Sequence, residues 1–175
     1  MMMKITMVMI LLLVPMHVFA TAQIPDRMLY QGETYPLFTE PLEQYFSEQA
    51  PRREALFPSV CTACWRGYVA TWEVKENYLY ITKLVAGTCR PDASEIPLAT
   101  IFPGQTAPVK AVWFSGELRI PQGKLLRYER RGFGAVYERE LYVTIKKGRL
   151  VHEMVIDNAK REDSSHPGPM TPSLQ

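Results

Sequence analysis

The chain has 175 residues, with 20 Lys and Arg against 18 Asp and Glu, a formal net charge of +2, and 47% hydrophobic residues. This near-neutral balance argues against a nucleic-acid-binding protein, whose basic face shows in its net charge. Seven Phe, nine Tyr and three Trp favour a well-packed fold over a disordered chain, and the length suits one domain.

The N-terminal segment has the three parts of a secretory signal peptide. Lys4 precedes a run of apolar and small residues from Ile5 to Ala20, and the small-residue pattern Ala20-Thr21-Ala22 closes it. Because the run is shorter than the roughly 20 residues that span a membrane, an uncleaved anchor is the less favoured alternative. We predict cleavage after Ala22. The resulting protein of 153 residues begins at Gln23, is soluble, and meets the membrane only during export.

The first part of the mature chain predicts a strand and a helix. Residues 28–38 are typical of a strand interrupted by a turn at Gly32. Residues 41–49 predict a helix, because Pro41 suits the first helical position and apolar residues recur at the i, i+3, i+4 spacing. The prolines bounding residues 51–58 predict a loop.

The middle of the chain changes to long strands with short turns. Residues 65–74 and 78–85 are rich in aromatic and β-branched residues and predict a hairpin that turns at residues 75–77. Both faces of the first strand are partly apolar, so we expect it to be central. Residues 86–108 hold four prolines and predict an irregular connection, with a short strand at residues 96–101.

The last part of the chain predicts strands at residues 109–120, 124–131, 135–146 and 149–157. Pro121-Gln122-Gly123 and Lys147-Gly148 supply the turns, each with the Gly that a tight turn needs.

These elements predict a mainly β, or β-dominated α+β, fold. We expect an antiparallel meander of about seven strands that forms a sandwich or curved sheet with one short helix. The predicted organisation is a signal peptide at residues 1–22, a single β-rich domain at residues 23–157 and a disordered tail at residues 158–175, where apolar periodicity is lost.

Three cysteines remain after cleavage: Cys61, Cys64 and Cys89. Cys61 and Cys64 have the spacing of a redox motif, but such a motif needs a helix start that lowers the thiol pKa, and Cys64 opens a β-patterned run. We therefore predict a structural disulfide between Cys89 and either Cys61 or Cys64, with the third thiol free. Cys64 is the preferred partner, because the predicted hairpin places position 64 opposite position 88 or so.

Motifs of common catalytic and metal sites are absent from the sequence. Only His152 and His166 remain after cleavage, too few for a His-rich metal site, and neither a nucleophile elbow nor a phosphate-binding loop occurs. We predict no metal and no cofactor. A pair of carboxylates in one cleft would be enough for a glycan-active hydrolase, although solvated strand faces carry such residues far more often. The candidates are Glu73, Glu117, Glu138 and Glu140.

The most unusual local composition lies between residues 127 and 137, where three arginines and three aromatic residues surround two glycines. Interfaces favour this combination, because Arg and Tyr supply contact area and directional bonds. The alternative is a glycine-rich hairpin loop whose aromatic side chains belong to the core and whose arginines are solvated. The candidate binding residues are Arg127, Tyr128, Arg130, Arg131, Phe133 and Tyr137.

Two segments carry a resemblance to known proteins: residues 61–74, CTACWRGYVATWEV, and residues 114–126, FSGELRIPQGKLL. Together with residues 131–138 and 140–143, they resemble an uncharacterised family of secreted bacterial proteins, over a span from Leu29 to Val151. The resemblance implies a relationship but no activity. We expect a non-enzymatic binding protein of the bacterial envelope, periplasmic or secreted, whose partner is a protein or an envelope component and not a nucleic acid; the alternative is the glycan-active hydrolase.

Overall fold

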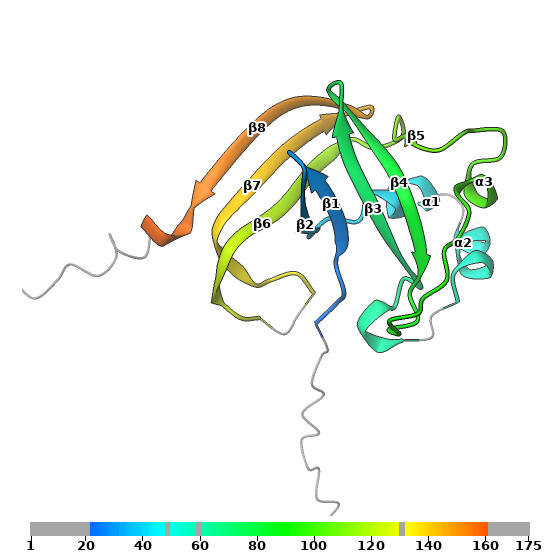
Figure 1. Ribbon diagram of the computed structural model, residues 1–175, viewed down its shortest axis with the longest axis horizontal. Coiled ribbons are helices and arrows are strands. Elements are labelled where there is room, and N and C mark those ends of the chain that lie inside the picture. Colours follow the sequence, from blue (N-terminus) through cyan, green and yellow to red (C-terminus); the bar gives the residue numbers. More distant parts are fainter. Residues whose placement is uncertain (1–21, 48–49, 59–60, 130–131, 161–175) are drawn as a thin grey trace, which may run out of the picture.

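The computed structural model describes residues 22–47, 50–58, 61–129 and 132–160 (Figure 1). Residues 1–21 of the predicted signal peptide and residues 161–175 of the predicted tail lie outside them, and residues 158–160 form a helical turn. The elements are β1 (Asp26–Tyr30), β2 (Glu33–Leu37), α1 (Pro41–Phe46), α2 (Ala50–Leu56), the 3-10 helix η1 (Thr62–Cys64), β3 (Tyr68–Lys75), β4 (Tyr78–Ala86), α3 (Leu98–Ile101), β5 (Val109–Lys110), β6 (Gly116–Arg127), β7 (Val136–Lys146) and β8 (Arg149–Asp157).

The strands form one mixed sheet in the order β2-β1-β3-β4-β8-β7-β6, with β5 paired to β4. The prediction of a β-dominated fold with a curved sheet is confirmed. Neighbouring strands are antiparallel except β1 and β3, which run parallel, so the fold is not a pure meander. The N–H of Phe38, just after β2, donates to the carbonyl of Arg119 in β6 at 2.8 Å, so the two edges of the sheet meet there.

Three hairpins of this sheet, β1–β2, β3–β4 and β7–β8, have two-residue turns: Gln31-Gly32, Glu76-Asn77 and Lys147-Gly148. All six residues have positive φ values, between 48° and 83°. Positive φ at both central positions makes a type I′ turn, whose twist matches that of the flanking strands. The predicted turns at Gly32, residues 75–77 and residues 147–148 are therefore confirmed.

The turn predicted at Pro121-Gln122-Gly123 is wrong, because β6 runs through it. Gln122 pairs with Arg139 and Leu125 with Tyr137, which leaves one extra residue on β6 and forms a β-bulge. Gly123 has a φ of 77°, a conformation that suits a bulge as well as a turn. The predicted strand at residues 109–120 is also divided, because a turn at residues 112–113 and three irregular residues separate β5 from β6.

The helices differ from the prediction in number and place. Helix α1 confirms the predicted helix but ends at Phe46, and α2 occupies the predicted loop around Pro51. Proline is tolerated there because the first helical turn has no partner for its N–H groups. Helix α3 replaces the strand predicted at residues 96–101, and η1 with the turn after it delays the start of β3 to Tyr68.

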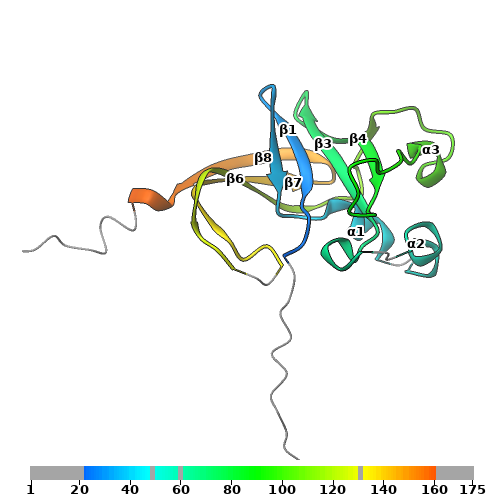
Figure 2. The ribbon, with the colours of Figure 1, turned by 60° about the horizontal axis from the view of Figure 1, so that its bottom comes forward.

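The core lies inside the curved sheet and extends to the helices at one end (Figure 2). Trp72 is fully buried among aliphatic side chains of β1, β4, β6 and β7, and Phe46, Phe57 and Phe102 connect this cluster to the helices. Each such side chain contributes about 1.5–3 kcal/mol when fully buried. Among the described residues, no helix is long and apolar enough to cross a membrane.

Candidate functional site

The segment with the unusual composition forms the loop between β6 and β7, which lies beside the start of the chain that leads into β1 (Figures 1 and 2). Tyr128 is 59% exposed in this loop, and Arg127 forms an exposed ion pair with Glu129 at 3.3 Å. Arg130 and Arg131, two of the predicted binding residues, lie outside the described residues. The structure therefore describes four of the six candidate binding residues.

Arg119 of β6 fixes the returning half of this loop. Its guanidinium donates to the carbonyls of Phe133 at 2.6 Å and Ala135 at 2.7 Å, and it forms an ion pair with Glu140. Desolvation acts to raise the pKa of Glu140, but hydrogen bonds from Arg119 and from Tyr142 hold it below its usual value. The charged Glu140 thus orients Arg119, and Arg119 holds the loop.

An aromatic cluster forms where this loop meets the end of β2. The ring of Phe38 stacks on that of Phe133 with 5.1 Å between centroids, and it meets the edge of Tyr137 at 5.9 Å. The Arg119 guanidinium lies 5.4 Å from the Phe38 ring centroid. Phe38 was missed in the sequence, because it lies far along the chain from the loop and only the curl of the sheet brings the two together.

A hollow of about 220 Å³ opens beside this cluster. We call it the aromatic hollow. Three of the predicted binding residues line it together, namely Tyr128, Phe133 and Tyr137, and none of the three is fully buried. Phe133 and Tyr137 are partly buried, whereas Tyr128 is exposed. The other lining residues of the predicted mature chain are Gln23, Pro25, Pro36, Phe38, Leu125, Glu129, Gly132 and Ala135; Ala22, which the predicted cleavage removes, also lines the hollow.

Two further hollows lie next to the aromatic hollow, one against the β1–β2 hairpin and one beside the start of β3 and the end of β4. The first, of about 320 Å³, shares Pro25 and Pro36 with the aromatic hollow. The second, of about 240 Å³, shares Ile24 and Arg27 with the first and reaches Cys89. Because each hollow shares lining residues with the next, the three lie side by side, and we call this row of neighbouring hollows the groove.

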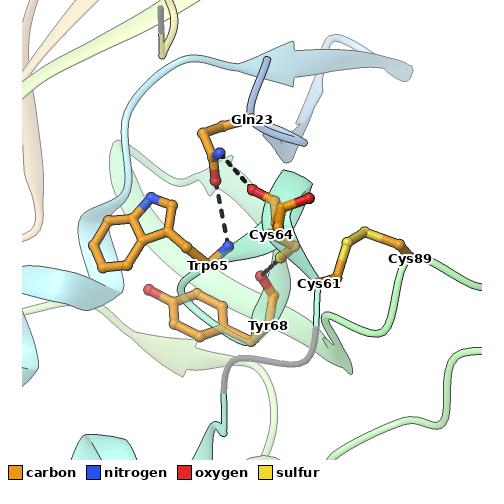
Figure 3. Close-up of a disulfide and its surroundings, with 7 residues drawn as sticks. Gln23, Cys61, Cys64, Trp65, Tyr68 and Cys89 are labelled. Carbon is orange, nitrogen blue, oxygen red and sulfur yellow. Dashed lines mark hydrogen bonds between the residues drawn. A yellow bond between two sulfur atoms is a disulfide. The ribbon is translucent and has the colours of Figure 1, made fainter. Parts of the chain in front are cut away.

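The disulfide at the far end of this groove joins Cys61 and Cys89, whose Cα atoms are 6.0 Å apart, and Cys64 is free and buried (Figure 3). The preference for Cys64 as the partner of Cys89 is wrong. Cys64 lies in η1 and not in the β3–β4 register, which begins at the pair Tyr68 and Ala86. Its thiol turns inward and donates to the carbonyl of Tyr68 at 3.1 Å, and burial raises its pKa.

The N-terminal arm, residues 23–25, is fixed against the turn that carries Cys61 and Cys64 (Figure 3). The Gln23 side chain donates to the carbonyl of Thr62 at 3.0 Å and accepts the N–H of Trp65 at 3.3 Å. The N–H of Ile24 donates to the carbonyl of Ala63 at 2.7 Å. The arm is thereby held in place as one wall of the groove.

A second cluster of charges lies inside the fold. Asp26 is fully buried and accepts hydrogen bonds from Arg66, the N–H of Ala70 and the indole of Trp72, at 2.9, 3.0 and 2.9 Å. Arg66 also pairs with Glu40 at 3.0 Å. Desolvation raises the pKa of Asp26, against the effect of Arg66. Because Asp26 and Arg66 are shielded from solvent, this cluster is structural.

The carboxylates considered for glycan hydrolysis occupy separate roles. Glu140 is paired with Arg119, and its lowered pKa is the opposite of what a general acid requires. Glu138 accepts the N–H of Lys124 in the bulge at 2.9 Å. Glu73 lies on β3 and Glu117 on β6, and these two strands are not neighbours in the sheet. The part of the chain that the structure describes holds no group of three or more His, Cys, Asp or Glu that could bind a metal ion.

The fold and the groove define a disulfide-bonded domain built on a curved, mixed β-sheet. No known protein family, curated protein or solved structure matches the chain. The resemblance to secreted bacterial proteins therefore stays a prediction.

Proposed function

We propose that the protein is a non-enzymatic binding module of the bacterial envelope that holds an extended segment of a partner protein in the aromatic hollow. The observation that carries this proposal is the convergence of Phe38, Tyr128, Phe133 and Tyr137 on one partly exposed hollow. Aromatic side chains that line a preformed concave surface provide most of the binding energy at interfaces, at low conformational cost.

The rigidity of the site supports binding. The bonds from Arg119 to two loop carbonyls and the fixed N-terminal arm hold both walls of the hollow before a ligand arrives. Preorganised walls reduce the entropy that binding costs. The row of neighbouring hollows that leads away from the aromatic hollow suits an extended chain better than a compact molecule, and aromatic-lined grooves are a recurring site for extended, Pro-rich peptides.

The disulfide indicates a compartment outside the cytosol, because such bonds persist in oxidising environments. Together with the predicted signal peptide at residues 1–22, it supports a periplasmic or secreted location. The bacterial envelope follows from the resemblance of residues 61–74 and 114–126.

Selection from a displayed peptide library tests this function. Peptides enriched by the mature protein should lose most of their enrichment on Y128A and F133A, which remove aromatic walls of the hollow. The M154A variant is the control, because Met154 is an exposed apolar residue of β8 that does not line the aromatic hollow. Equal enrichment on folded Y128A, F133A and M154A proteins would refute the assignment.

A further inference from the structure

The far end of the groove is cationic, whereas its other end is aromatic. The hollow beside the disulfide has an apolar floor that includes Val69 of β3 and Val85 of β4, and two arginines, Arg27 and Arg90, line it. Within the described residues no carboxylate forms an ion pair with either guanidinium. The hollow thus combines apolar area with two positive charges that no described carboxylate pairs with. We call it the cationic hollow.

Both arginines are positioned by the fold. Asp26 and Met28 point inward from β1 and are fully buried, so the alternation of a strand turns Arg27 between them to the outer face. Arg90 directly follows Cys89, which the disulfide ties to Cys61. Two like charges that face one hollow repel each other unless an anion lies between them, and the guanidinium fork fits a carboxylate with two parallel hydrogen bonds.

The cationic hollow and the aromatic hollow belong to the same groove. The middle hollow shares Ile24 and Arg27 with the cationic hollow, and it shares Pro25 and Pro36 with the aromatic hollow. A peptide that crosses from the end of β2 over the start of β1 to β3 and β4 would therefore meet aromatic side chains at one end and arginine side chains at the other.

We propose that the ligand of this groove is an extended acidic peptide segment, whose aromatic or proline side chains fill the aromatic hollow and whose carboxylate binds Arg27 and Arg90. This inference rests on the proposed function and adds the charge and polarity of the partner. Charge complementarity favours it over an uncharged apolar segment, which would bury part of the hollow and leave both guanidinium groups without partners.

Peptide selection on the full mature protein tests the inference with a matched pair of variants. R27Q/R90Q removes the two charges of the groove, and R149Q removes the charge of an exposed arginine of β8 outside the three hollows. Peptides selected on the unaltered protein and on R149Q should carry Asp or Glu at a constant distance from an aromatic residue or proline. Peptides selected on R27Q/R90Q should keep the aromatic residue or proline and lose the acidic residue.

The affinity of the most enriched peptide, labelled with fluorescein and measured by fluorescence polarisation, gives the second readout. R27Q/R90Q should weaken binding at least tenfold at low ionic strength, and the difference from the unaltered protein should shrink as salt screens the charges. The inference is overturned if the selected peptides lack acidic residues, or if R27Q/R90Q selects and binds acidic peptides equally well. Either result leaves the aromatic hollow standing as a binding site. A failure of the proposed function looks different, because F133A would then enrich the same peptides as the unaltered protein.

Discussion

Removing the Cys61–Cys89 disulfide should destabilise the domain far more than removing the Cys64 thiol. The bond joins residues 28 positions apart, and the loop-closure entropy of such a loop corresponds to about 3.6 kcal/mol of stability. Cys64 forms no disulfide, so C64A removes only one buried heavy atom and should cost on the order of 1 kcal/mol. The double variant C61S/C89S therefore loses a large share of the 5–15 kcal/mol that is typical of a domain.

Urea unfolding of the unaltered protein, C64A and C61S/C89S measures this difference. Peptide mapping without reduction should show one disulfide, Cys61 to Cys89, in both the unaltered protein and C64A. Three results would contradict the Cys61–Cys89 pairing and its weight in stability: loss of the disulfide in C64A, a bond between Cys64 and Cys89, or a C64A protein that is less stable than C61S/C89S.

Three further predictions concern the packing and the charges around the site. In G87A the new Cβ would lie 2.5 Å from Cys64 Sγ and 2.7 Å from the Tyr68 nitrogen, so the thermal midpoint should fall by several degrees or more; an unchanged midpoint would contradict the packing. E140Q should cost about 1–3 kcal/mol near neutral pH. The folded-state pKa of Glu140 lies below its usual value of 4.5, so the difference in free energy of unfolding between the unaltered protein and E140Q is fully present above that value. It should shrink as the pH falls through the folded-state pKa. A difference that stays constant in urea unfolding between pH 7 and pH 3 would exclude the ion pair. The Cys64 thiol should resist alkylation by iodoacetamide until urea unfolds the chain, because it is buried and its pKa is raised, and rapid labelling of native protein would contradict this.

The local signals of the sequence were sufficient for the strands and most turns. Glu76-Asn77 and Lys147-Gly148 lie between β-rich runs, and their local preferences and the final structure agree. Gly123 failed as a predictor, because a positive φ serves a bulge and a turn equally well, and only the pairing with β7 distinguishes them. Helix α2 was hidden by Pro51, which breaks a helix interior but not its first turn.

The candidate site was partly visible in the sequence. The local composition of residues 127–137 pointed to Tyr128, Phe133 and Tyr137, and the structure brings them together at one hollow. Phe38 and the N-terminal arm were missed, because they reach the loop through the curl of the sheet and through bonds such as that from Ile24 to Ala63. Likewise, the disulfide partner of Cys89 depended on η1, a turn with no distinctive sequence pattern.

The outer part of β8 is the competing interaction surface. Among the described strands, β8 pairs with β4 only through Arg149, and Val151, Met154 and Val155 are exposed beyond that point. A register irregularity at Val151 and the charge of Glu153 are features that protect sheet edges from pairing with other chains. We therefore propose the groove, and not this edge, as the binding site.

A titration of the ¹⁵N-labelled mature protein with the most enriched peptide, followed by NMR, tests the binding groove most directly. We expect chemical shift changes at the amides of Ile24, Asp26, Arg27, Phe38 and the described part of the β6–β7 loop, including Tyr128 and Phe133. The amides of residues 151–155 of β8 should stay unchanged. Shift changes confined to β8, with none in the β6–β7 loop or the N-terminal arm, would contradict the assignment of the groove as the binding site.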